Sequence, residues 1–401
     1  MKHPEDPVAF VAKRLEAHRP TGPFGEGAFS NRLHDERIAA RLGMALGVAF
    51  VTCFATGLAS HFAQHPLDVG FLSTPASPSW LYRITQGVHV TAGIASTPLL
   101  LLKLWTVYPL LFTWPPARNA AHATERMFVA PLVALALFQL FSGLANTTRW
   151  YPWQFNFTVT HFWTGWMLMG VLVIHIGAKL TQTRRALRTP LQRSTDPAPA
   201  RGELSRRGLL WTAGAAVAAV TITTVGQTFR PLEGLAALAP RVPDIGPQGI
   251  PVNRTANGAG VLQTARDADW RLTIDGAVAQ PLELSLADLR AMTQHEVELP
   301  ITCVEGWSAG ARWGGVRIAD LLARAGAADG AEVVVTSMQT RGSYRSSALN
   351  TIVAGHEHTL LALDINDEPL HLDHGFPCRL IAPNRPGVLQ TKWVTTLHAR
   401  I

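Results

Sequence analysis

Charged residues are scarce in this sequence: they make up 16% of its 401 residues, whereas hydrophobic residues make up 47%. This scarcity excludes an ordinary soluble protein and indicates membrane spans, and the length predicts two or more domains. The first 41 residues also lack the hydrophobic core of a cleaved signal peptide. Because the sequence has no internal repeat and no nucleic-acid-binding module, we attribute its formal net charge of +7 to membrane topology.

Five apolar stretches each approach the ~20 residues that a helix needs to cross a bilayer. These stretches cover 42–61, 84–107, 127–147, 158–178 and 208–229. Arginines gather before the first stretch and in the connections that follow the second and fourth stretches. By the positive-inside rule, the N-terminus is cytoplasmic and the chain after the fifth stretch lies on the outer side of the cytoplasmic membrane.

The pattern changes after about residue 269 to short alternating runs that end in turns, with short helices expected at 285–292 and 316–325. We therefore predict an all-α transmembrane bundle of four helices plus a fifth anchor helix, followed by an α+β, strand-rich domain. The predicted segments are a cytoplasmic tail at 1–41, a four-helix membrane domain at 42–180, a basic linker at 181–207, the fifth helix at 208–229, a linker at 230–250 and an exported domain at 251–401.

A pair of arginines precedes the fifth stretch, in the run Ser205-Arg206-Arg207-Gly208-Leu209-Leu210. The run resembles a twin-arginine export signal, which moves domains that have already folded in the cytoplasm. Two arginines beside a span are also what the positive-inside rule produces without export. The export hypothesis predicts a cofactor in the C-terminal domain. Pro240 disfavours cleavage after Ala239, so the fifth helix is expected to remain as an anchor.

Histidines within the spans are functional candidates, because an ionisable side chain is costly in a bilayer. His89 lies near the outer end of the second span, and His161 and His175 lie near the outer and inner ends of the fourth. The 14 positions between His161 and His175 place them roughly 21 Å apart on nearly the same helix face. Solvated positions at the interface are expected for His61, His65 and His122.

The four-span unit resembles bacterial b-type cytochromes, in which one His from each of two facing helices holds a haem iron. The resemblance implies that His89 and His161 bind an outer haem b; helix-to-helix hydrogen bonds or a bare anchor without haem are the alternatives. An inner haem matches poorly, because Lys103 stands where a partner for His175 is needed. Lys103 can extend its ammonium to the interface. His175 is a candidate cofactor-binding residue as a haem ligand, and a hydrogen bond or contact with a quinone are the alternatives.

The chain has only three cysteines, Cys53, Cys303 and Cys378, and the last two would ordinarily suggest a disulfide in an exported domain. Cys303 lies in the segment Pro300-Ile301-Thr302-Cys303-Val304-Glu305-Gly306-Trp307-Ser308. This segment, with 251–255, 270–276, 374–380 and Lys392-Trp393, closely resembles the sulfite oxidase family of molybdenum enzymes. The similarity is greatest to its bacterial periplasmic methionine-sulfoxide-reductase branch.

The resemblance implies one molybdenum, held by the two thiolates of a molybdopterin and by the thiolate of Cys303, which is the catalytic residue. Soft thiolates suit a transition metal, and a coordinated thiol stays deprotonated. Five residues at matching positions are candidates for binding the cofactor phosphate: Asn253, Arg341, His374, Arg379 and Lys392. Ordinary surface charge is the alternative for these residues, and Cys378 is expected to be an inert core residue.

The residues after Cys303 bear on the substrate. Sulfite-oxidising members place arginines there, whereas Glu305 stands two positions on in this chain and opposes a sulfite dianion. Arg312 and Arg345 could still approach the pocket. We expect electrons to pass from the quinone and quinol pool through haem to molybdenum, where a neutral S-oxide or N-oxide is reduced. Oxidation of a sulfite-like donor, or a non-catalytic ligand-binding domain on a membrane anchor, are the alternatives; no nucleic-acid partner is expected.

Overall fold

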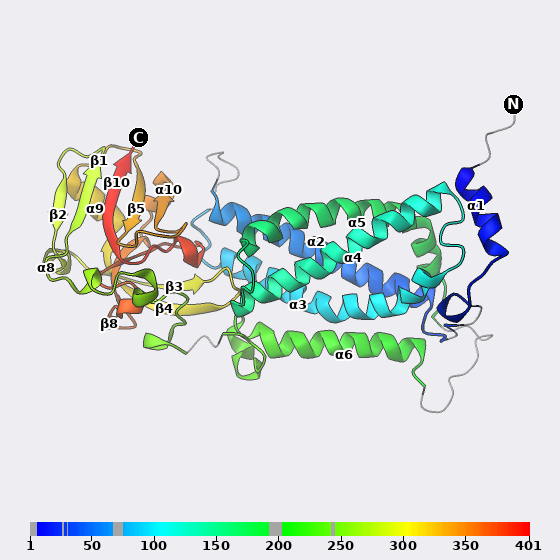
Figure 1. Cartoon of the computed structure of the whole chain (residues 1–401). Helices are drawn as coiled ribbons and strands as arrows, with labels where there is room; N and C mark the ends of the chain where they lie inside the picture. Colours follow the sequence, from blue (N-terminus) through cyan, green and yellow to red (C-terminus); the bar gives the residue numbers. More distant parts are fainter. Residues whose placement is uncertain (1–5, 26–27, 30, 67–74, 192–202, 242–244) are drawn as a thin grey trace. The chain divides into compact units, whose positions relative to one another are not determined.

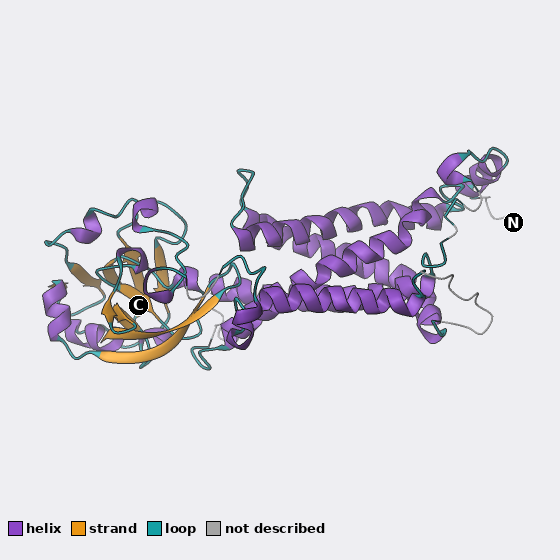
Figure 2. Ribbon diagram, turned by 90° about the horizontal axis from the view of Figure 1, so that it is seen from below, coloured by secondary structure: helices purple, strands orange, loops and turns teal. Residues whose placement is uncertain are grey.

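The computed structural model describes residues 6–25, 28–29, 31–66, 75–191, 203–241 and 245–401. Within these ranges, helices form the N-terminal part of the chain, and the strands belong to the C-terminal part (Figures 1 and 2). The chain divides into two compact units. The membrane unit comprises residues 1–55 and 89–224, and the strand-rich unit comprises residues 56–88 and 225–401.

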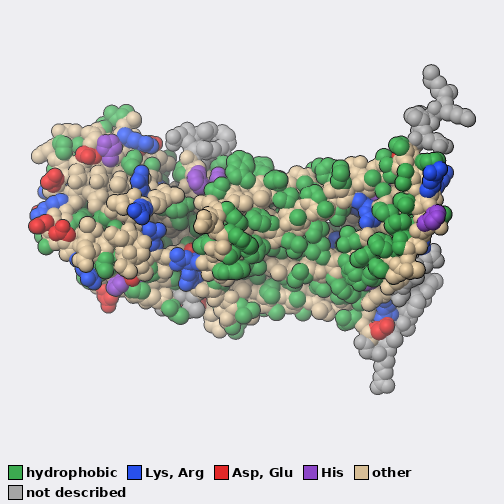
Figure 3. Space-filling view, viewed as in Figure 1, with side chains coloured by type: hydrophobic (Ala, Val, Ile, Leu, Met, Phe, Trp, Pro, Cys, Tyr) green, Lys and Arg blue, Asp and Glu red, His purple; other side chains and the backbone are tan. Residues whose placement is uncertain are grey.

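Five of the described helices are long and apolar enough to cross a membrane, as the sequence predicts. They are α2 (Glu36–Gln64), α3 (Leu81–Val107), α4 (Ala120–Thr148), α5 (Phe157–Arg188) and α6 (Arg206–Val225), and the short helix α1 (Pro7–Glu16) precedes them. The helices α4 and α5 pack side by side (Figure 1). Large hydrophobic side chains are exposed along these helices, and few charged side chains appear among them (Figure 3). Such a surface is stable in lipid.

The helices do not end where the apolar stretches end. The helix α2 begins at Glu36, α5 continues to Arg188 and α6 ends at Val225, whereas the apolar stretches begin at 42 and end at 178 and 229. Hydrogen bonding is cooperative along a helix, so an apolar stretch extends into neighbouring polar residues. Parts of the predicted tail, at 1–5, 26–27 and 30, and of the two predicted linkers, at 192–202 and 242–244, lie outside the described residues.

Two five-stranded sheets form the C-terminal fold and confirm the predicted strand-rich α+β class. The first has the order β2-β1-β10-β5-β6, with β1 and β10 parallel; the second has the order β3-β4-β7-β8, and β9 also pairs with β7. The strands are β1 (Leu272–Gly276), β2 (Leu282–Leu284), β3 (His295–Thr302), β4 (Ser308–Arg317), β5 (Glu332–Ser337), β6 (Ser346–Leu349), β7 (Leu360–Ile365), β8 (Glu368–Pro369), β9 (Arg379–Ile381) and β10 (Val394–Arg400). The helices are α7 (Ala256–Ala259), α8 (Leu286–Ala291), α9 (Ile318–Ala325) and α10 (Thr351–Ala354).

The hairpin of β3 and β4 positions the site. The two strands pair antiparallel from His295 opposite Gly315 to Thr302 opposite Ser308, so residues 303–307 form the loop that joins them. The apolar core of the second sheet includes Cys303, Trp307 and Trp313, the last of which is fully buried. Because both ends of the loop are fixed by paired strands and by this core, its side chains have defined positions.

Candidate functional site

The loop that carries Cys303 is closed by its own backbone. The amide of Cys303 donates to the carbonyl of Trp307 at 2.9 Å, and the amide of Gly306 donates to the carbonyl of Cys303 at 3.1 Å. Gly306 has φ of 101°, a conformation that glycine adopts without strain. Cys303 is 4% exposed. The tight turn therefore presents a buried cysteine in a rigid setting.

Hydrogen-bond donors point at the sulfur of Cys303. Asn253 Nδ2 donates to Sγ at 2.8 Å, and the amide of Glu305 lies 3.4 Å from Sγ. Trp307 Nε1 donates to Asn253 Oδ1 at 3.3 Å, which fixes the orientation of the amide group. Donors favour the thiolate over the thiol, and a thiolate is the form that binds a metal. Burial, and then the electrostatic influence of the nearby Cys303, raise the pKa of the Tyr344 phenol.

Arg379, the first residue of β9, is a buried cation. The Cζ atom of Arg379 lies 5.0 Å from the ring centroid of Trp313, and Arg379 is 2% exposed. Its NH1 donates to the carbonyl of His374 at 3.0 Å and its NH2 to the carbonyl of Gln390 at 3.2 Å, while Nε has no hydrogen-bond partner among the described residues. Burial lowers the pKa of Arg379 to about 9. A buried guanidinium with an unused donor suits an anion such as the phosphate of molybdopterin.

His374 and Lys392 lie next to Arg379. Gly375 has φ of 113°, and a Cβ atom there would approach Cβ of both Arg379 and Lys392 at 3.1 Å, so glycine permits the close packing of the two cations. His374 Nε2 forms a 2.6 Å hydrogen bond with the carbonyl of Pro247. Burial, with a contribution from the charges of Arg379 and Lys392, lowers the pKa of His374 to about 4, so its ring is neutral at pH 7.

Lys392 connects this cationic group to the segment of Asn253. Its Nζ donates to the carbonyls of Arg254 and Asp373 at 2.7 and 2.8 Å. Asn253 precedes Arg254 directly, so the residue that donates to Cys303 Sγ and the residue that accepts from Lys392 Nζ are neighbours in the chain. Four of the five predicted phosphate-binding residues therefore share one region of the fold. Arg341 is exposed between β5 and β6, and no hydrogen bond joins it to the other four in the described part of the chain.

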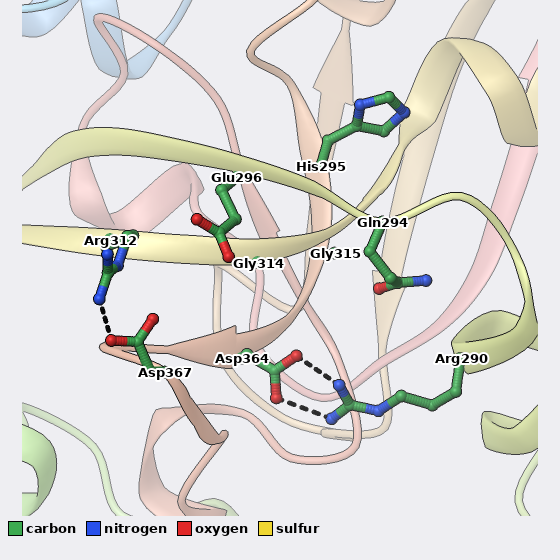
Figure 4. A pocket seen from close by; sticks show the side chains of 9 residues that line it. All are labelled: Arg290, Gln294, His295, Glu296, Arg312, Gly314, Gly315, Asp364 and Asp367. Atoms are coloured by element: carbon green, nitrogen blue, oxygen red, sulfur yellow. Dashed lines mark hydrogen bonds and ion pairs between the residues drawn. The ribbon is translucent and has the colours of Figure 1, made fainter.

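A separate pocket of about 380 Å³ lies at the other end of β3 (Figure 4). Two ion pairs line it, between Arg290 and Asp364 and between Arg312 and Asp367. His295, the first residue of β3, also lines this pocket, whereas Cys303 follows the last. The eight residues of β3 span about 26 Å. Arg312 therefore pairs with Asp367 in a pocket that is separate from the Cys303 loop.

The membrane unit brings His89 of α3 and His161 of α5 together. Their ring centroids are 6.2 Å apart and their planes are inclined by 80°. A metal midway between two imidazoles, about 2.0 Å from each coordinating nitrogen, requires a centroid separation of about 6 Å. His89 Nδ1 forms a hydrogen bond with the carbonyl of Cys53 at 2.9 Å, and His161 Nδ1 forms one with Ser142 Oγ at 2.8 Å. Such bonds at Nδ1 orient an imidazole that binds metal through Nε2. The pair fits a haem iron.

The surroundings of His175 are different. His175 interacts electrostatically with Lys103, Lys179 and Glu125, and the last two form an ion pair at 2.5 Å. Lys103 Nζ donates to the carbonyl of Ala39 in α2 at 2.6 Å. The described residues that interact with His175 are thus charged side chains, and none of them is the second imidazole that an inner haem needs.

The three histidines expected at the interface have other neighbours in the described chain. The rings of His61 and His65 stack at 4.6 Å near the end of α2, and His122 lies in the first turn of α4, where its Nδ1 accepts from the amide of Arg118 at 3.2 Å. Groups of three or more potential metal ligands do not occur among the described residues.

Sequence reasoning missed two residues that orient the proposed ligands, Ser142 and Trp307. Ser142 is 1% exposed within α4 and contacts His161. A buried hydroxyl in an apolar span is itself a functional signal, because it needs a partner in lipid. Trp307 gives no such signal, since an aromatic residue in a loop of this kind is also an ordinary core residue.

Two family models match the chain. The oxidoreductase molybdopterin-binding domain matches residues 259–400, and prokaryotic cytochrome b561 matches residues 44–193. The chain therefore joins a membrane domain of the cytochrome b561 type to a molybdopterin-binding domain of the sulfite oxidase family. The two models imply a molybdenum cofactor and haem b, and they confirm the predicted resemblances.

Three relatives illustrate the similarity. The uncharacterized oxidoreductase YuiH of Bacillus subtilis is 35% identical over 126 residues, which are 31% of this chain and 62% of that protein. The mitochondrial sulfite oxidase of Drosophila melanogaster is 31% identical over 32% of this chain and 27% of its own length. The putative protein-methionine-sulfoxide reductase subunit YedZ1 of Azospira oryzae is 31% identical over 32% of this chain and 48% of its own length. The chain thus spans less than two thirds of each relative.

Proposed function

We propose that this protein is a membrane-bound molybdenum oxidoreductase that reduces an S-oxide or N-oxide with electrons from quinol. The observation that carries the proposal is the buried sulfur of Cys303, which accepts a 2.8 Å hydrogen bond from Asn253 next to a cationic network. A structural cysteine has no need of a donor at this distance, and the other cysteine of the domain, Cys378, is fully buried among apolar residues. The arrangement supports Cys303 as a metal ligand.

Bound molybdenum would supply two-electron oxygen-atom transfer. Cys303 would hold the metal through its thiolate, and Asn253 would keep that thiolate oriented and deprotonated. Arg379 and Lys392 would bind the cofactor phosphate, while neutral His374 donates or accepts a hydrogen bond without adding charge. Arg341, on an exposed loop, would contribute only if that loop moves toward the cofactor on binding.

His89 and His161 would hold haem b, which would supply one-electron transfer, because two histidine ligands are typical of an electron carrier. Oxidation of one quinol releases two electrons and two protons, and reduction of one S-oxide consumes two of each and yields water. The overall exchange balances without another reactant. His175, surrounded by charged groups, is proposed to contact the quinone or to stabilise the polar inner end of the bundle rather than to bind a second haem.

We further propose that the strand-rich domain lies on the outer side of the cytoplasmic membrane. The arginine-rich connections support this topology. The twin-arginine motif remains a prediction, since Arg206 also has a structural partner: its Nε lies 2.9 Å from Asp35 Oδ2.

The substrate preference rests on Glu305, which is 7% exposed two positions after the metal ligand. Arg241 Nε lies 4.0 Å from its carboxylate, so the negative charge is partly balanced. The remaining negative character favours a neutral oxide over a sulfite dianion. The name of the Azospira relative supports a methionine-sulfoxide substrate, and the names of the mitochondrial relatives support sulfite oxidation as the second candidate.

The test uses the detergent-purified full-length protein. We expect about one molybdenum per chain, a b-type haem spectrum, and oxidation of reduced haem when methionine sulfoxide is added. Sulfite that reduces the haem, with no effect of methionine sulfoxide, would reverse the proposed direction of electron flow. Protein without molybdenum would favour a non-catalytic binding domain.

A further inference from the structure

Three backbone groups in and beside the Cys303 loop are bonded by residues from outside the two sheets. Gln86 Nε2 donates to the carbonyl of Val304 at 2.8 Å, and the hydroxyl of Thr228 donates to the carbonyl of Gly306. The amide of Ser308 donates to the carbonyl of Gln227 at 2.8 Å. Gln86 belongs to α3, and Gln227 and Thr228 follow α6, yet all of them lie in the strand-rich unit.

The side chain of Gln86 is itself held in place. It is 3% exposed, and its Oε1 accepts from Ser60 Oγ at 2.9 Å. Ser60 Oγ also contacts Gln64 Nε2 at 3.0 Å and the hydroxyl of Tyr82 at 3.3 Å. A buried amide with partners at both ends has one favoured orientation. Gln86 therefore directs its Nε2 donor at Val304, the residue after the proposed metal ligand.

Neighbouring contacts fix the same end of α3. The amide of Tyr82 donates to Asn384 Oδ1 at 2.7 Å, and Asn384 Nδ2 donates to the carbonyl of Pro75 at 2.6 Å. Arg83 donates from Nε and NH2 to the carbonyl of Thr228 at 3.2 and 3.0 Å. The first turns of α3 are thus joined by backbone and side-chain hydrogen bonds to Asn384 and Thr228 of the same unit.

We propose that Gln86 is a positioning residue of the molybdenum site, which makes the outer end of a membrane helix a structural part of that site. The inference rests on the proposed role of Cys303 as the metal ligand. Through the carbonyl of Val304, Gln86 fixes the peptide between Val304 and Glu305, whose amide lies 3.4 Å from Cys303 Sγ, and hence the direction of the thiolate. A displacement of about 1 Å at a reacting centre can lower a rate about a hundredfold.

The test compares Gln86→Met with Gln64→Met in the full-length protein. Methionine matches glutamine in length but cannot donate to Val304, whereas Gln64 bonds the same serine and does not reach the loop. We expect Gln86→Met to retain molybdenum, to change the g values of the Mo(V) electron paramagnetic resonance signal, and to lower kcat about tenfold or more with a much smaller change in KM. Gln64→Met should give the wild-type signal and rates.

A second readout does not depend on the cofactor. In cofactor-free protein, the rate at which Cys303 is alkylated by iodoacetamide, followed by peptide mass spectrometry, should rise several-fold in Gln86→Met because the loop opens more often. If the Gln86→Met protein does not accumulate, the Thr228→Val variant is used in its place. This variant removes the donor to the carbonyl of Gly306 and should give the same results. If these variants gave the wild-type Mo(V) signal and the wild-type alkylation rate of Cys303, the inference would be overturned. Absence of molybdenum from the wild-type protein would refute the proposed function instead.

Discussion

Replacing Arg379 by Met should separate a cofactor-binding arginine from a structural one. Burial lowers the pKa of Arg379 from 12.5 to about 9. At 1.36 kcal/mol per pKa unit, the charged side chain carries a desolvation cost on the order of 5 kcal/mol. Two charge-assisted hydrogen bonds, to the carbonyls of His374 and Gln390, offset about 3–6 kcal/mol of this cost. The Nε donor of Arg379 has no hydrogen-bond partner among the described residues, so it does not offset any further part of this cost.

These opposing magnitudes nearly cancel, so Arg379→Met should change the stability of the cofactor-free protein by no more than about 2 kcal/mol. Loss of a charge-assisted contact with the phosphate, worth about 1.5–3 kcal/mol, should lower cofactor affinity roughly tenfold to a hundredfold. The assay is thermal unfolding of cofactor-free protein in detergent, together with molybdenum and pterin content at limiting cofactor. A large loss of stability with unchanged molybdenum per folded chain would refute the reasoning.

Three further predictions follow from the two sites. Because burial lowers the pKa of His374 to about 4, below its unfolded value of 6.5, the stability present above pH 6.5 should fall by about 2 kcal/mol between pH 7 and pH 5. The His374→Gln variant should lose this pH dependence in thermal unfolding of cofactor-free protein. An equal pH dependence in the wild type and the variant would contradict the prediction. Ser142→Ala removes the partner of His161 Nδ1 and should raise the haem midpoint potential in a redox titration, whereas Ser96→Ala, which removes a hydroxyl bonded within α3, should not. Cys303→Ser should abolish molybdenum-dependent activity and leave the haem spectrum unchanged; retained activity would exclude the catalytic role.

The membrane spans and the Cys303 loop could be predicted because their signals are local in the sequence. An apolar stretch of about 20 residues suffices for a span. The segment around Cys303 carries its own motif, and Asn253, His374, Arg379 and Lys392 do share one region of the structure. Arg341 lies on an exposed loop and has no hydrogen bond to these residues in the described part of the chain, because a match in sequence order does not determine where a loop side chain points.

The contacts that support the two sites could not be predicted, because they join distant parts of the chain. Gln86 and Val304 are separated by 218 positions, and the sequence around Gln86 resembles any membrane helix. The ends of the helices were also predicted imperfectly. Hydrogen bonding carries α2 and α5 into polar residues that hydropathy alone assigns to a tail and a linker.

The strand-rich unit is discontinuous, because residues 89–224 separate its two stretches. A gene fragment that encodes only residues 251–401 would therefore lack Gln86, Gln227 and Thr228, and with them the bonds to the carbonyls of Val304 and Gly306 and to the amide of Ser308. Transfer of this catalytic domain to a different electron carrier in evolution would require that carrier to provide equivalent donors. The fusion of the two domains is consequently more than a tether, and recombination at the sequence boundary between them would not yield two interchangeable modules.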